Sequence, residues 1–120
     1  MNKNQKKLYY DLEDRTLKFA KDVRIFVKKI PRTVANFEDG KQLIRSSGSV
    51  GANYIEANES LSKKDFLFRI KISRKEAKET KYWLLLLYIT NSLLEKERQK
   101  LIKESIELVK IFSSMIHKSK

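Results

Sequence analysis

The fold of this chain is decided by residues 45–89, which read RSSGSVGANYIEANESLSKKDFLFRIKISRKEAKETKYWLLLLYI. The first part of this stretch is rich in serine, glycine and alanine, and the second part spaces its apolar residues as an amphipathic helix does. A short polar turn separates the two parts. The stretch therefore predicts a helical hairpin, in which small side chains let a neighbouring backbone approach closely.

The second helix of this hairpin is marked by its start and by its periodicity. Ser62 and Asp65 have the spacing of a capping box with aspartate in place of glutamate, so we expect a helix over residues 63–90. Its seam positions alternate four and three residues apart, as in an antiparallel bundle, and are Phe66, Ile70, Ser73, Ala77, Thr80, Leu84 and Leu87. Trp83 and Leu86 add apolar surface beyond this seam, which predicts self-association.

The spacing of apolar residues and the helix start and stop signals predict three further helices, over residues 6–30, 36–59 and 95–117. Pro31 ends the first of them, and Asn36 is the expected N-cap of the second. The second also carries a stripe made of Phe37, Ile44, Ser47, Gly51 and Ile55. Its glycines each lower helix stability by roughly 1 kcal/mol relative to alanine, so this helix needs support from its neighbours.

The composition favours one all-α domain. A chain of 120 residues with 41% hydrophobic content can bury a core of its own. Three glycines and one proline are few of the residues that form turns and irregular loops. We therefore expect residues 1–120 to form a single up-down-up-down antiparallel four-helix bundle.

The sequence also bears on the compartment. The chain has no cysteine, hence no disulfide and no thiolate metal site, and we expect a cytoplasmic location. Asp11, Glu13 and Asp14 interrupt the basic start before any apolar region develops, which argues against a signal peptide. The longest apolar run, residues 82–89, is far shorter than the roughly 20 residues that span a bilayer, so we expect no membrane partner.

The formal net charge of +12 favours a polyanionic partner such as nucleic acid, although a lysine-rich surface that only maintains solubility stays open as an alternative. The cations concentrate in the first and third helices, whereas residues 33–59 carry a net negative charge. The candidate phosphate contacts are Lys18, Lys21, Lys28, Lys29 and Arg32 on the first helix, and Lys64, Lys71, Arg74, Lys75 and Lys78 on the third. Tyr9, Tyr10 and Tyr54 could stack on bases, but core or interface positions are the commoner use of tyrosine.

Two pairs of glutamates, Glu56 with Glu59 and Glu76 with Glu79, raise the question of a carboxylate metal site. Metal centres of bundles pair such glutamates with histidines at ExxH spacing, and the sole histidine, His117, lies near the end of the chain. We expect these glutamates to pair with cations such as Arg45, Arg74 and Lys75 or with neighbouring subunits, and we expect no metal, no cofactor and no enzymatic activity. No histidine lies near an internal serine in sequence to act as its base, so no catalytic residue is assigned. The residues expected to serve packing or subunit contacts are Arg45, Gly48, Gly51, Asn53, Tyr54, Glu56, Glu76, Glu79, Trp83 and Leu86.

Two segments carry a family resemblance, QLIRSSGSVGANYIEA at residues 42–57 and KKDFLFRIKISRKEAKETKYWLLLL at residues 63–87. They resemble the bacterial four-helix-bundle family that includes the proteins encoded in intervening sequences of 23S ribosomal RNA genes, over roughly residues 10–112. The resemblance implies an up-down bundle that assembles into a homopentameric barrel with a basic surface, and it transfers no catalytic residues. Ala57 stands where many relatives have glycine, and it is still small enough for close packing.

Two hypotheses of different classes follow. The first is a non-enzymatic, homopentameric protein that binds structured RNA linked to 23S rRNA or its intervening sequences. The alternative is a protein-interaction scaffold, similar to the accessory subunit of a diversity-generating retroelement, whose partner is a reverse transcriptase. A helical protein of membrane surfaces ranks third, because the apolar faces are committed to packing.

Overall fold

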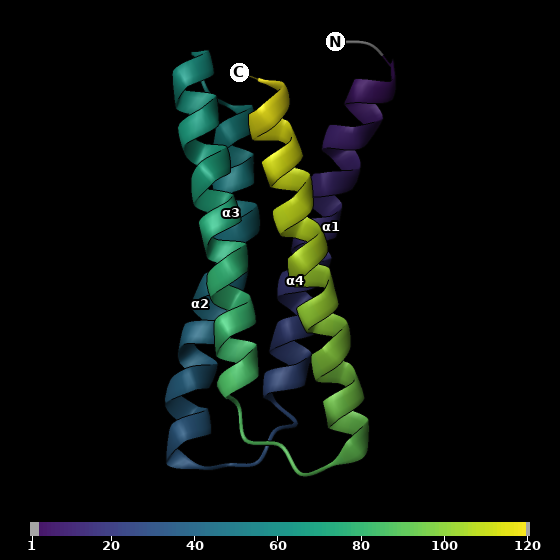
Figure 1. The fold of residues 1–120 in the computed structure, drawn as a ribbon, viewed down its shortest axis with the longest axis vertical. Coiled ribbons are helices and arrows are strands. Elements are labelled where there is room, and N and C mark those ends of the chain that lie inside the picture. Colours follow the sequence, from purple (N-terminus) through teal and green to yellow (C-terminus); the bar gives the residue numbers. More distant parts are fainter. Residues whose placement is uncertain (1–2, 120) are drawn as a thin grey trace.

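The computed structural model describes residues 3–119, with side chains from Leu12 onward. The expected all-α bundle is confirmed, and no strand occurs among the described residues. Successive helices run in opposite directions along an elongated molecule of 46 × 23 × 19 Å (Figure 1). The helices are α1 (Lys3–Val27), α2 (Val34–Asn58), α3 (Lys63–Leu86) and α4 (Ser92–Lys118).

The four helices form a ring in which each packs against two neighbours. The contact between α2 and α3 is the most extensive, and the contact between α1 and α4 is the thinnest. Over the described residues α1 and α3 do not touch, so they occupy one diagonal of the bundle (Figure 1). The outer surfaces of α1 and α3 therefore face in different directions.

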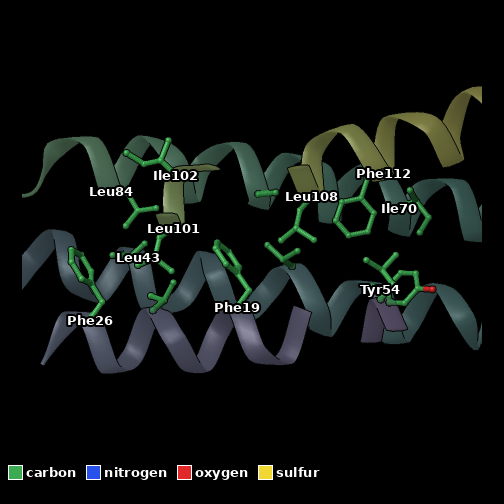
Figure 2. Packing of buried hydrophobic residues seen from close by; sticks show 14 of the residues in the cluster. Phe19, Phe26, Leu43, Tyr54, Ile70, Leu84, Leu101, Ile102, Leu108 and Phe112 are labelled. Carbon is green, nitrogen blue, oxygen red and sulfur yellow. The ribbon is translucent and has the colours of Figure 1, made fainter. Parts of the chain in front are cut away.

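All four helices contribute apolar side chains to one core (Figure 2). Phe19 and Phe26 enter it from α1, Tyr54 from α2 and Phe112 from α4. The rings of Tyr54 and Phe112 pack at a tilt, with their centroids 6.1 Å apart. Tyr54 is thus a core residue, buried with 0% exposure, and does not reach the surface.

Small polar side chains explain the close approach of α2 and α3. Ser73 on α3 donates a hydrogen bond to the carbonyl oxygen of Val50 on α2 at 2.9 Å. Thr80 on α3 donates to the hydroxyl oxygen of Ser46 on α2, also at 2.9 Å. All of these hydroxyls are buried, and each has a partner, so they add no unsatisfied polar group to the interface.

The glycines of α2 face α1 instead of α3. A Cβ atom at Gly51 would lie 2.8 Å from Oγ1 of buried Thr16, a contact that real Cβ atoms do not make. A Cβ atom at Gly48 would lie 3.3 Å from the guanidinium of Arg24, which is exposed and can move. The packing of α1 on α2 therefore requires glycine at position 51, whereas a side chain as small as alanine would fit at position 48.

Asn36 is not the N-cap of α2, contrary to expectation. Thr33 caps the helix, and its Oγ1 accepts a hydrogen bond from the backbone amide of Asn36 at 3.0 Å. The N-cap at Ser62 is confirmed, because its hydroxyl accepts from the backbone amide of Asp65 at 3.1 Å. The prediction for Asn36 was wrong because its buried side chain forms hydrogen bonds with the backbone of Pro31 and of Tyr88 instead of capping the helix.

The end of α3 also differs from expectation, since the helix stops at Leu86 and not at residue 90. Leu87 adopts an extended conformation (φ −61°, ψ 138°) and buries its side chain in the core. Arg98 of α4 donates from Nη1 to the carbonyl oxygens of Leu84 and Leu87 at 3.2 and 2.6 Å, which satisfies groups left open by the helix end. Asn91 then caps α4, which starts three residues earlier than expected.

Part of the expected stripe on α2 is exposed. Phe37 and Ile55 keep 63% and 52% of their surface accessible, because both lie on the outer edge of α2 rather than toward the core. Trp83 is partly buried against the core, while Leu86 remains 47% exposed. The isolated chain thus presents apolar surface on α2 and at the end of α3.

Candidate nucleic-acid interface

Four of the lysines expected to contact phosphate form a row on α3, at Lys64, Lys71, Lys75 and Lys78. They are seven, four and three residues apart and all are exposed, so they share one side of the helix. Ile70 and the other buried positions of α3 lie on the opposite side. We call the surface defined by these four lysines the outer face of α3.

The positive charge of α3 is not neutralised by ion pairs with the part of the chain whose side chains are described. The helix carries eight cations, and none of them forms an ion pair with any residue of the described part of the chain. Its acidic residues lie elsewhere: Glu76 is buried toward α2, Glu79 bonds Arg45 of α2, and Asp65 sits in the first turn. The outer face therefore offers a row of free ammonium groups to an anionic ligand.

A shallow pocket extends this basic surface toward α4. It has a volume of about 510 Å³ and lies between the two helices, with the apolar side chains of Ile106 and Val109 among its walls. Lys78, Lys81 and Lys110 also line it, and only Lys110 has an acidic neighbour, Glu107 at 3.7 Å. Sequence reasoning missed Lys81 and Lys110. The spacing of Lys81 three residues after Lys78 was the available signal, but the approach of Lys110 depends on how α4 packs.

Arg74 differs from the other candidates on α3. It is partly buried and donates from Nη1 to the hydroxyl oxygen of Ser113 on α4, at a long distance of 3.4 Å. Arg74 thus borders the pocket side of α3 and does not stand in the lysine row.

The first set of candidate cations is partly neutralised, and three of its members, Lys28, Lys29 and Arg32, lie beyond α1, which ends at Val27 and not at residue 30 as expected. Lys18 pairs with Asp22 at 2.6 Å, and Lys29 pairs with Glu97 of α4 at 3.0 Å. Lys21, Lys28 and Arg32 are exposed and have no ion pair within the described residues. Because α1 and α3 lie on a diagonal, the two expected sets do not merge into one face, and the outer face of α3 is the stronger candidate.

Comparison with known proteins supplies the family. Residues 10–114 match the family model described as 23S rRNA-intervening sequence protein. The chain belongs to this family. A solved structure from Bacteroides thetaiotaomicron VPI-5482, described as a protein with unknown function from the S23 ribosomal protein family, is 35% identical with a TM-score of 0.71. The match covers 87% of this chain and 96% of that chain. No curated protein matches the sequence.

In this member of the family, Arg45 of α2 forms ion pairs with both glutamates of α3. Its Nη1 lies 2.9 Å from Glu76 and its Nη2 lies 2.6 Å from Glu79. The indole N–H of Trp83 also donates to Glu79, at 3.1 Å, and with Arg45 it lowers the pKa of that carboxyl. The hydrogen bond to Glu79 in turn raises the pKa of Arg45. These glutamates are therefore occupied in holding α2 against α3.

Two further residues of α2, Asn53 and Glu56, were expected to serve packing or subunit contacts. Asn53 accepts a hydrogen bond from Arg69 of α3 at 3.2 Å and donates to the carbonyl oxygen of Ser49. Glu56 is exposed. Within residues 12–119 no cluster of three or more acidic or histidine side chains is suited to a metal ion. The side chains of Tyr9 and Tyr10 lie outside the described part.

None of the helices in the described part of the chain is both long enough and apolar enough to cross a bilayer.

Proposed function

We propose that this protein is a non-enzymatic RNA-binding protein whose target is structured RNA linked to 23S rRNA or its intervening sequences. The observation that carries the proposal is the row of lysines on the outer face of α3, none of which is neutralised by a carboxylate in the described structure. Membership of the family links the chain to ribosomal RNA genes. The net charge of +12 adds a long-range attraction for any polyanion.

Lysines on one helix face suit recognition of a phosphate backbone rather than of base edges. Each phosphate that they neutralise releases counterions, which makes the affinity fall with salt by a slope of about 0.7 per contact on single strands and about 0.9 on duplex DNA. Phosphate contacts alone carry little sequence information. Recognition is therefore proposed to rest on the shape and the charge of the RNA.

The proposal includes self-association of the chain, with the family's pentameric barrel as the expected assembly. The apolar surface left open on α2 supports it: Val34, Phe37 and Ile55 are 85%, 63% and 52% exposed. Bringing copies together would multiply the positive charge that one RNA molecule meets. Sedimentation equilibrium tests this part, and a monomer at tens of micromolar protein would contradict it.

Binding is tested by fluorescence anisotropy with a labelled, structured fragment of 23S rRNA at several salt concentrations. The triple variant Lys71→Gln, Lys75→Gln and Lys78→Gln should bind more weakly, and its slope of log affinity against log salt should be shallower by about 2. The matched control is Lys96→Gln, Lys100→Gln and Lys103→Gln on α4, which removes the same charge from exposed positions. Equal losses of RNA affinity in the two variants would mean that binding depends only on net charge, and this result would contradict the assignment to α3.

A further inference from the structure

Two aromatic side chains stand on the outer face of α3 without any role in the core. Phe68 is 60% exposed and Tyr82 is 55% exposed. With three lysines they form the series Phe68, Lys71, Lys75, Lys78 and Tyr82, in which the spacings are three, four, three and four residues. This alternation keeps all five on one stripe of the helix. The two rings are separated by about 21 Å along the helix axis, at 1.5 Å per residue.

Neighbouring side chains support both rings from one side. The ring of Tyr82 meets that of Trp83 edge to face, with centroids 5.1 Å apart. The guanidinium of Arg69 lies 5.9 Å from the centroid of Phe68. Trp83 is itself held by its hydrogen bond to Glu79, so the aromatic end of the stripe rests on the packed part of the bundle. The rings remain more than half exposed, which leaves them open to a ligand.

The stripe combines exposed aromatic rings with lysines that lie between them. Exposed aromatic rings favour an apolar partner, but the three lysines between them pair with no carboxylate of residues 12–119 and would repel a second copy of the same surface. Unpaired nucleotides satisfy both properties at once, because their bases stack on aromatic rings and their phosphates bind cations. A continuous RNA duplex keeps its bases stacked inside the helix and cannot use the rings.

We infer that the outer face of α3 binds an unpaired segment of RNA, with Phe68 and Tyr82 stacking on bases and Lys71, Lys75 and Lys78 contacting the phosphates between them. The inference rests on the proposed RNA binding and adds the class of RNA, a single-stranded loop rather than an uninterrupted duplex. It also assigns to the two rings a role that is separate from the charge.

The experiment compares two labelled RNAs of equal length, a hairpin with a long unpaired loop and a blunt duplex, by fluorescence anisotropy. The test variant is Phe68→Ala with Tyr82→Ala. The control is Tyr88→Ala with Leu93→Ala, which removes two side chains that are 58% and 69% exposed on other surfaces. Circular dichroism melting establishes that each variant is folded.

The wild type should bind the hairpin more tightly than the duplex. The test variant should lose at least about 30-fold in affinity for the hairpin and less than about 2-fold for the duplex, as expected from the loss of two stacked bases. The control should retain both affinities. The conservative variant Tyr82→Phe keeps the stacking surface and should bind the hairpin as the wild type does.

The outcomes separate this inference from the function on which it rests. If the wild type binds neither RNA, both fail. If it binds RNA and the test variant keeps its hairpin affinity, or loses affinity for both RNAs equally, the stacking role is wrong and RNA binding stands. If sedimentation shows that the test variant changes the assembly mass of the protein, the stripe is a contact between subunits and the inference is overturned.

Discussion

The side chain of Asn36 forms hydrogen bonds with both backbone groups of Tyr88. Its Nδ2 donates to the carbonyl oxygen of Tyr88 at 2.9 Å, and its Oδ1 accepts from the amide of Tyr88 at 2.8 Å. The same Nδ2 donates to the carbonyl oxygen of Pro31, at 2.9 Å. One buried side chain therefore joins the loop between α1 and α2 to the loop between α3 and α4, which lie together at one end of the bundle (Figure 1).

Asn36→Ala should lower the free energy of unfolding by about 3 kcal/mol, because three backbone groups lose a partner in a buried place. Urea denaturation measures the effect. Asn58→Ala is the control, since Asn58 is exposed and makes one surface hydrogen bond to Glu13, and it should cost less than about 0.5 kcal/mol. Similar costs for the two variants would mean that Asn36 does not hold the loops.

The two glycines Gly48 and Gly51 should respond to alanine with opposite signs. Gly48→Ala should raise the free energy of unfolding by up to about 1 kcal/mol, because alanine favours the helix and the nearby guanidinium of Arg24 can move. Gly51→Ala should lower it by about 1 to 3 kcal/mol, because the new methyl group overlaps the side chain of Thr16. Thermal and urea denaturation of both variants measures the difference.

Thr16→Ala provides the internal control for Gly51. It removes the hydroxyl that would lie 2.8 Å from the new Cβ atom, so the double variant should be more stable than the sum of the single effects predicts. Additive effects would show that another contact limits Gly51.

The stability contributed by Glu79 should depend on pH. Hydrogen bonds from Trp83 and Arg45 hold the pKa of Glu79 below its ordinary value of 4.5, so the folded protein binds this proton less readily than the unfolded chain does. Ionised Glu79 therefore stabilises the fold above pH 4.5, and this contribution is lost as the pH falls below that value.

Glu79→Gln should accordingly be less stable than the wild type at pH 7, and the difference between the two proteins should shrink as the pH is lowered from 5 toward 3. Urea denaturation across this range isolates Glu79, because the other carboxyl groups are common to both proteins. A difference that stays constant with pH would contradict the assignment.

Ion pairs should reduce the part that Lys18 and Lys29 play in the proposed RNA binding. Lys29→Gln removes a cation whose charge Glu97 already compensates, so it should change RNA affinity less than Lys75→Gln, which removes an uncompensated one. Glu97→Gln releases Lys29 and should raise the affinity slightly at low salt. Anisotropy titrations of the three variants at equal salt decide this point, and an effect of Lys29→Gln as large as that of Lys75→Gln would refute it.

The helices themselves could be predicted from sequence because they rest on local signals. Ser62 begins α3 at the expected residue, since a capping hydroxyl and its target amide are three residues apart. The end of α3 could not be predicted, because it depends on another helix. Leu87 leaves α3 to fill the core, and Arg98 of α4 donates hydrogen bonds to the carbonyl oxygens at the helix end. Asn36 was misassigned for the same reason, since its partner Tyr88 lies 52 residues away.

The candidate site was predicted in part. The row of lysines on α3 follows from periodicity alone, and the heptad that places Ile70 in the core also places Lys71 and Lys75 outside. The separation of this row from the cations of α1 could not be seen, because it depends on which helices are neighbours. The rings of Phe68 and Tyr82 were overlooked because apolar residues were assigned to seams, although their spacing from Lys71 and Lys78 was already visible in the sequence.

The unequal contacts between the four helices also predict the order in which parts of the molecule unfold locally. Over the described residues the contact between α1 and α4 is the thinnest and that between α2 and α3 the most extensive, so amide protons of α1 should exchange with deuterium before those of the central hairpin. The segment from Val34 to Leu86 would then form the most protected cooperative unit of the protein. The helix proposed to bind RNA would stay rigid while the N-terminal helix moves away, and the proposed binding would survive fluctuations that transiently open the bundle.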